Sequence, residues 1–166
     1  IATAAVLEGS RTLLVEIQAL TVPAKGSISR VYSDRIDSAR AARVAATLEK
    51  SLGLRLSDQD IYINVAGGIR IAEVGVELAL AASIYSARTG IALPERTALA
   101  GELSLAAEVM SVRRLSGRIK TAYNLGFTNF VCPKDSGASE SPSEFSKALI
   151  VKNLKGAINA IFKNKA

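Results

Sequence analysis

Residues 64–83, NVAGGIRIAEVGVELALAAS, place a glycine pair and two acids between an apolar run and an Ala/Leu-rich run. Gly67 and Gly68 do not make a phosphate-binding loop, because neither the Lys and Ser or Thr of the Walker pattern nor a G-x-G-x-x-G pattern is present. A nucleophilic site would need a Ser, Thr or Cys where the loop meets the helix, and only carboxylates stand there. Glu73 and Glu77 could do acid–base chemistry across one helical turn, but we favour the interpretation that they complement the dipole at a helix N-terminus.

Positive side chains gather on a second predicted helix and suit a different chemistry, the neutralisation of phosphates. Arg114 and Arg118 are one helical turn apart, and Arg113 and Lys120 are two turns apart, so we expect them to project together from the polar face. Few acids interrupt this run, which favours contact with nucleic acid, and solvated surface charge is the alternative interpretation. The secondary candidates for phosphate contact are Arg40, Arg43 and Lys50.

Histidine is absent and cysteine occurs once, which excludes several kinds of site. Without histidine or a CxxC pair, we expect no metal site, no cofactor and no histidine-dependent catalysis in this chain. Cys132 cannot form an internal disulfide, and Lys134 is the only basic residue beside it in the sequence that could favour a thiolate. We therefore interpret Cys132 as a small buried side chain.

Composition limits the class of protein. The chain has 166 residues, of which 49% are hydrophobic, so we expect residues 1–166 to form a single domain with its own core. Its 21 Lys and Arg exceed its 15 Asp and Glu, and the resulting net charge of +6 favours anionic partners. Neither an apolar run of about 18 residues nor a signal-peptide pattern is present, so we expect a soluble, cytoplasmic protein with no membrane partner.

Alternating strand and helix patterns predict an α/β fold that positions these residues. Asp37 or Ser38 is expected to cap the first helix and Asn153 the last, while Gly53 and Gly90 are expected to end two of the helices. The predicted strands are residues 12–20, 60–65, 97–105, 108–110, 127–131 and 148–151. The predicted helices are residues 38–52, 73–89, 112–125 and 153–162, and a polar loop is predicted at 135–144.

Three segments are diagnostic when they are taken together: LLVEIQAL at 13–20, ATLEKSLGLRLSDQDIYINVAGGIRIAE at 46–73 and GELSLAAEVMSVRRLSGRIKTAYNLGF at 101–127. They resemble, in order and spacing, the C-terminal Lon-protease-like domain of bacterial RadA (Sms) DNA repair proteins. The resemblance implies the ribosomal protein S5 domain 2-like α/β fold (α+β) of Lon peptidase domains. Val74 stands where that family usually has proline, which concerns the local shape of the loop.

The resemblance also implies what the glycine-containing loop is. Active Lon peptidases have a serine within a G-P-S-A-G pattern at the start of this helix, and a lysine on a later helix is its base. In this chain the resemblance places Gly75 at the serine position and Arg118 at the lysine position. Glycine has no side chain to attack with, and arginine is too basic to accept a proton near neutral pH. Ser83 lies about two turns further along its helix and Lys120 about 200° around its helix from Arg118, so neither replaces the missing group. The resemblance therefore implies a former active site with no catalytic residue.

RadA proteins carry a zinc finger and a RecA-like ATPase ahead of this domain, and no signature of either occurs in this sequence. The resemblance thus implies a fragment of a DNA-dependent ATPase that drives branch migration in recombination, with ATP and zinc bound only in the missing domains. This domain would support a homo-oligomeric ring, commonly hexameric, and add DNA contacts. Two alternatives stay open: a purely structural module that only closes the ring, and a residual serine peptidase that uses an unrecognised nucleophile.

Overall fold

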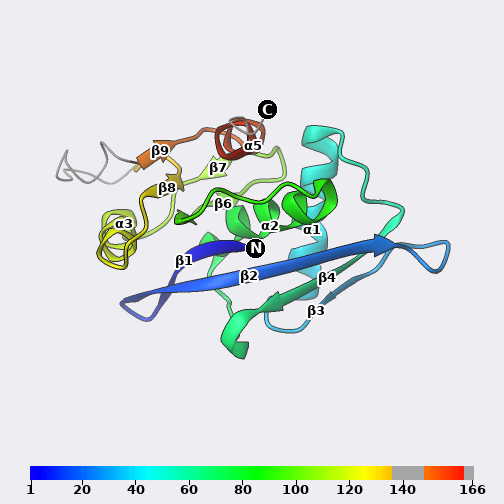
Figure 1. Cartoon of the computed structure of the whole chain (residues 1–166), viewed down its shortest axis with the longest axis horizontal. Coiled ribbons are helices and arrows are strands. Elements are labelled where there is room, and N and C mark those ends of the chain that lie inside the picture. The colour runs from blue at the N-terminus through cyan, green and yellow to red at the C-terminus, as the bar shows by residue number, and fades with distance from the viewer. Residues whose placement is uncertain (136–147, 163–166) are drawn as a thin grey trace.

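A mixed sheet forms the centre of the computed structural model, which describes residues 1–135 and 148–162 (Figure 1). In this part of the chain its strands are β1 (Ala2–Glu8), β2 (Arg11–Pro23), β3 (Val31–Ser33), β4 (Gln59–Val65), β5 (Thr97–Leu99), β8 (Asn129–Cys132) and β9 (Ala148–Ile150). Their spatial order is β3-β4-β2-β1-β5-β8-β9. β2 pairs antiparallel with β1 and β4, and the other neighbours are parallel. The predicted α/β class is confirmed.

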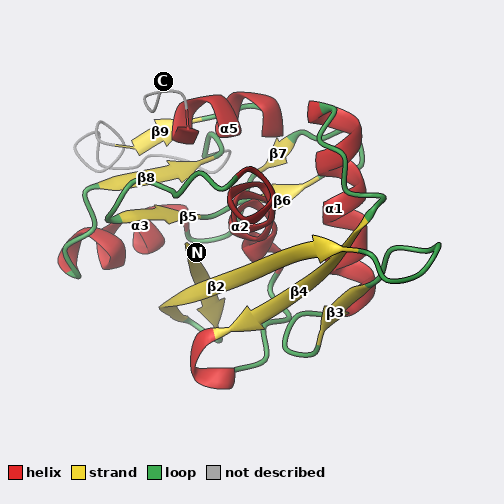
Figure 2. Cartoon of the chain, turned by 45° about the vertical axis from the view of Figure 1, so that its right-hand side comes forward, coloured by secondary structure: helices red, strands yellow, loops and turns green. Residues whose placement is uncertain are grey.

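Helices cover both faces of this sheet (Figure 2). The described helices are α1 (Ser38–Leu52), α2 (Glu77–Thr89), α3 (Leu115–Asn124) and α5 (Leu154–Phe162). Successive side chains of a strand point to opposite faces, so β1 contributes to two cores. Ala4 and Val6 pack into the larger core with α1, α2 and α5, whereas Ala5 packs into the smaller core with Ile119 of α3 and Phe130 of β8. The central strand therefore joins the two layers.

Local sequence signals placed α1, β4 and α5 correctly. Asp37 caps α1 by accepting a hydrogen bond from the backbone N–H of Arg40 at 3.0 Å, and Gly53 ends it in the left-handed conformation with φ of 67°. Asn153 caps α5 through its side-chain oxygen, which accepts from the N–H of Gly156 at 2.7 Å. Each of these signals acts within one turn of the chain, which is why the sequence alone reveals it.

α2 is the most deeply buried helix of the described structure. Residues 75–84 are all buried, and Leu78, Leu80 and Ile84 have no exposed surface. Full burial of such a side chain stabilises the fold by about 1.5–3 kcal/mol. The helix begins at Glu77 rather than at the predicted residue 73, because a short 3-10 turn, η2 (Val74–Val76), precedes it.

Two strands were not predicted, and one predicted strand is interrupted. β1 is rich in alanine, a residue with low strand propensity, and it forms a strand because both of its faces are covered. β3 is a short strand at the sheet edge. The predicted strand at 97–105 ends at Leu99, and a separate two-stranded ribbon follows, made of β6 (Glu102–Leu103) and β7 (Val109–Met110).

α3 begins at Leu115 and not at the predicted residue 112. Arg114 has φ of 55°, a left-handed conformation that an α-helix cannot pass through, so the helix begins after it. The polar loop predicted at 135–144 lies outside the described residues except for Asp135. Among the described helices, none has both the length and the apolar character needed to span a membrane.

Candidate functional site

A buried ion pair joins the turn before α2 to α3. Nη1 of Arg118 lies 2.5 Å from Oε1 of Glu73, and the two side chains are 1% and 15% exposed. The guanidinium also donates to the backbone oxygens of Ala5 and Arg113, both at 2.9 Å. A buried charge is tolerated when it is paired and hydrogen-bonded, and Arg118 is paired with Glu73 and donates to two carbonyl oxygens.

The Glu73 carboxylate holds three elements together. It accepts hydrogen bonds from Arg118, from the N–H of Leu7 at the end of β1 at 3.0 Å, and from the N–H of Gly75 in η2 at 2.5 Å. Burial by itself raises the pKa of Glu73, but these hydrogen bonds and the positive charge of Arg118 outweigh burial, so the pKa lies below its ordinary value. Glu73 is therefore an anion at neutral pH that accepts hydrogen bonds and has no proton to give.

Gly75 lies directly against this ion pair. A Cβ atom on Gly75 would stand 2.5 Å from Nη1 of Arg118 and 2.7 Å from Oε2 of Glu73, closer than real Cβ atoms approach other atoms. The carbonyl of Gly75 also accepts from the N–H of Gly101 at 3.0 Å, which holds the turn in place. The structure thus brings positions 75 and 118 together, and the charged groups occupy the space that a side chain at position 75 would need.

The surface position predicted for Arg118 is wrong. The one-turn spacing from Arg114 assumed a continuous helix, but the left-handed backbone of Arg114 lies before the helix start. Within α3, Arg118 shares the buried face with Leu115, Ile119 and Ala122. The sequence alone did not identify Glu73 as the partner of Arg118, because Glu73 was assigned to the N-terminus of the following helix. The available signal was an acidic residue two positions before Gly75.

Of the other cations predicted to bind DNA, some are exposed to solvent and two form ion pairs with an acidic residue. Arg113, Arg114 and Lys120 are exposed, so contact with DNA stays a prediction for them. Lys50 is exposed as well, near the end of α1. The remaining two candidates, Arg40 and Arg43, lie in the same helix and face an acid.

Glu77 is the acid that these two arginines face. Its carboxylate is 3% exposed and lies 3.1 Å from Nη1 of Arg40 and 3.4 Å from Nη2 of Arg43. It also accepts from the N–H of Leu103 at 2.8 Å, and it occupies the first turn of α2, as the dipole interpretation requires. Arg40, with 19% of its side chain exposed, is largely engaged in holding α1 to α2, whereas Arg43 keeps 47% exposed.

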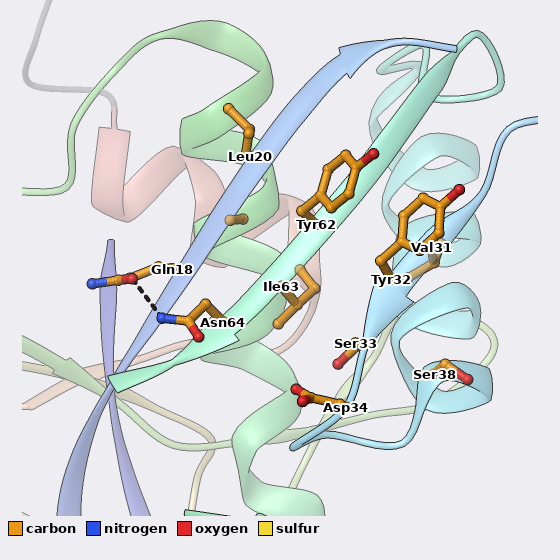
Figure 3. A pocket seen from close by; sticks show the side chains of 11 residues that line it. Gln18, Leu20, Val31, Tyr32, Ser33, Asp34, Ser38, Tyr62, Ile63 and Asn64 are labelled. Atoms are coloured by element: carbon orange, nitrogen blue, oxygen red, sulfur yellow. Dashed lines mark hydrogen bonds between the residues drawn. The ribbon is translucent and has the colours of Figure 1, made fainter. Parts of the chain in front are cut away.

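An aromatic groove of about 830 Å³ runs across β2, β4 and β3 (Figure 3). Tyr32 and Tyr62 are paired in register on neighbouring strands, and their rings stack with centroids 4.7 Å apart and an interplanar angle of 12°. Beside them, the amide of Asn64 donates to Oε1 of Gln18 at 2.8 Å. Among the described residues that line this groove, Asp34 is the one charged group, so the groove is poorly suited to phosphate.

Cys132 is buried, as predicted. Burial, followed by the nearby charge of Asp135, raises the pKa of its thiol to about 12, so the thiolate needed for nucleophilic chemistry is strongly disfavoured. In the part of the chain that the structure describes, no three metal-ligating side chains come together.

Comparisons with known proteins identify relatives for most of the chain. Residues 24–136 match the family model described as subunit ChlI of Mg-chelatase. The DNA repair protein RadA of Treponema pallidum (strain Nichols) is 59% identical over 132 residues, which are 80% of this chain and 29% of the relative. For the DNA repair protein RadA of Rickettsia prowazekii (strain Madrid E), the identity is 42% over 128 residues, 77% of this chain and 29% of the relative.

A third relative, the DNA repair protein RadA of Streptococcus pneumoniae (strain ATCC BAA-255 / R6), is 37% identical over 130 residues, 78% of this chain and 31% of the relative. The predicted likeness to RadA proteins is confirmed by these matches. The chain spans less than a third of the length of the curated relatives it matches.

Proposed function

Because this chain belongs to the family described as subunit ChlI of Mg-chelatase and is similar to one part of DNA repair proteins, we propose that it is a non-catalytic, Lon-like domain that contacts DNA during repair. The observation that carries the non-catalytic part is the ion pair of Glu73 and Arg118 packed against Gly75. Positions 75 and 118 lie side by side, as a nucleophile and its base must, and they hold neither group.

The charges at this centre support a structural role for it. Arg118 and the anionic Glu73 tie β1, η2 and α3 together through hydrogen bonds to Ala5, Leu7 and Gly75. These hydrogen bonds and the charge of Arg118 lower the pKa of Glu73, so its carboxylate is a weak base for a nucleophile near Gly75. The centre therefore stabilises the fold where an active relative would do chemistry.

Exposed cations support the DNA-contacting part of the proposal. Arg113, Arg114 and Lys120 are exposed around the start and outer face of α3, and the net charge of the chain is +6. Such side chains neutralise phosphates without reading bases, so binding should be weakly dependent on sequence and strongly dependent on salt. The rest of the proposal concerns the whole protein: a DNA-dependent ATPase in the cytoplasm that drives branch migration, in which this domain helps to form a ring of identical subunits.

The test is fluorescence anisotropy of labelled single-stranded and duplex DNA titrated with this chain at low and moderate salt. Replacing both Arg113 and Lys120 by Ala should weaken binding several-fold and lower the slope of log K against log salt by about 1 for each phosphate that is no longer neutralised. The matched control replaces Lys25 and Arg55, two exposed cations outside α3, by Ala. Equal weakening in both double variants would contradict the assignment to α3.

The rival functions have their own outcomes. A chain that assembles but binds no DNA at low salt would be a purely structural module. Cleavage of an unfolded protein substrate by the purified chain, abolished by a serine-protease inhibitor, would contradict the non-catalytic proposal and support a residual peptidase. Light scattering at the same protein concentrations reports the oligomeric state for each case.

A further inference from the structure

A hollow of about 730 Å³ lies between the turn that joins β1 to β2 and the first turns of α3. Among the described residues that line it, none is acidic, and the threonine methyl groups are its only apolar side-chain groups beyond the arginine stems. The side chains that line it are Ser10, Arg11, Thr12, Arg114, Ser116 and Thr121. Residues that carry guanidinium and hydroxyl groups therefore line one open space.

Arg114 is held over this hollow from both sides. Its backbone belongs to the start of α3, and Nη1 of its guanidinium donates to the carbonyl oxygen of Ser10 in the opposite turn at 3.4 Å. A guanidinium has five N–H donors, and this contact uses one of them. The others are available to an anion, and Arg114 is exposed to solvent.

Arg11 supplies the second guanidinium. Its ionic partner is Glu8, at 3.5 Å, and the two side chains are 72% and 61% exposed. An exposed pair of this kind is weak, so an anion in the hollow can draw Arg11 away from Glu8. The backbone adds further donors, because no side chain caps α3 in the described structure and the N–H groups of Ser116 and Gly117 in its first turn have no partner within the helix.

We propose that this hollow binds a phosphate group of a nucleic acid backbone. Charged and neutral donors that converge on one space without an acidic side chain fit a tetrahedral oxyanion, whose oxygens only accept hydrogen bonds when it is fully ionised. The inference rests on the proposed function for the identity of the ligand, and it adds Arg11 and the hydroxyl groups as contacts. It also makes Arg114 part of a defined phosphate site rather than one of several scattered surface charges.

The experiment places a carboxylate in the hollow. Gly117 lines it within α3, and a Cβ there would meet no atom within 4 Å, so Gly117→Glu fits without a clash. A glutamate in the first turn favours the helix, so the variant should fold. Gly26→Glu is the matched control, since it adds the same charge outside the hollow, at a glycine where a Cβ would also meet no atom within 4 Å. Both variants are compared with the unchanged chain in DNA anisotropy and in NMR titrations with inorganic phosphate.

We expect phosphate to shift the amide signals of Ser116 and Gly117 in the unchanged chain, and Gly117→Glu to abolish these shifts and to weaken DNA binding at least tenfold. Gly26→Glu should bind DNA within about threefold of the unchanged chain, because its added charge lies outside the hollow and is screened by salt. If phosphate shifts no signal at the hollow, or if both variants bind DNA equally well, the inference is overturned while the proposed function stands. If the unchanged chain binds phosphate at the hollow but no DNA, the proposed function fails, and so does the assignment of the ligand to nucleic acid.

Discussion

Arg118 and Arg114 stand four residues apart in the sequence and occupy opposite environments. Arg118 is buried, bonded to Glu73 and to two carbonyl oxygens, and encloses Gly75. Arg114 is exposed in a left-handed backbone conformation and makes one long hydrogen bond across an open hollow. A buried arginine with several bonded partners thus serves the fold, whereas an exposed arginine with free donors remains available to a ligand.

The largest effect is expected when the buried arginine loses its partner. Glu73→Ala leaves a buried positive charge and removes the acceptor for the N–H groups of Leu7 and Gly75, so it should lower the free energy of unfolding by about 3–5 kcal/mol. Urea denaturation measures this decrease. The matched control is Glu8→Ala, which removes the partner of the exposed Arg11 and should cost less than about 1 kcal/mol. Similar decreases in the two variants would remove the distinction between buried and exposed arginines.

A smaller effect is expected from adding a side chain at position 75, where we propose that active relatives have a nucleophile. Gly75→Ser pushes its Cβ against Arg118 and Glu73, so it should lower the free energy of unfolding by about 1–3 kcal/mol, as overpacking does. It should also leave the chain without peptidase activity, because the neighbouring Arg118 cannot accept a proton near neutral pH and the lowered pKa of Glu73 makes it a weak base. Gly26→Ser is the control, because a Cβ at Gly26 meets nothing within 4 Å and should change stability by less than about 0.5 kcal/mol. A Gly75→Ser variant as stable as the unchanged chain would show that the ion pair is not closely packed around position 75.

The smallest effect on stability is expected at the exposed arginine. Arg114→Gly removes the guanidinium but relieves the left-handed backbone, which costs a non-glycine residue about 1–3 kcal/mol. Glycine also raises the entropy of the unfolded chain, which costs about 0.4–1 kcal/mol, and the lost hydrogen bond to Ser10 costs about 0.5–1.5 kcal/mol more. These costs nearly cancel the relief, so the net change should be less than about 1 kcal/mol. Thermal unfolding followed by circular dichroism measures it. A strongly destabilised variant would mean that the bond to Ser10 supports the fold and that Arg114 is a structural residue like Arg118.

Much of the fold could be predicted from the sequence because its signals are local. The cap at Asp37, the left-handed Gly53 and the alternation in β4 depend on neighbours within one turn or one strand. β1 could not be predicted in this way, because its alanines form a strand only when neighbouring strands and helices cover both faces. The start of α3 depended on the backbone conformation of Arg114, which the sequence pattern does not reveal.

The candidate site, like the fold, could be predicted from the sequence only in part. By itself the sequence determined the residue types: a glycine at position 75, an arginine at position 118, an acid near that glycine, and an excess of cations around α3. Only the tertiary structure decided which cation is buried, because burial depends on where α3 begins and which face it turns to the sheet. It also decided that Glu73 pairs with Arg118 and that Arg11 and Arg114 line the same hollow, since residues far apart in the chain come together only after the sheet and helices have packed.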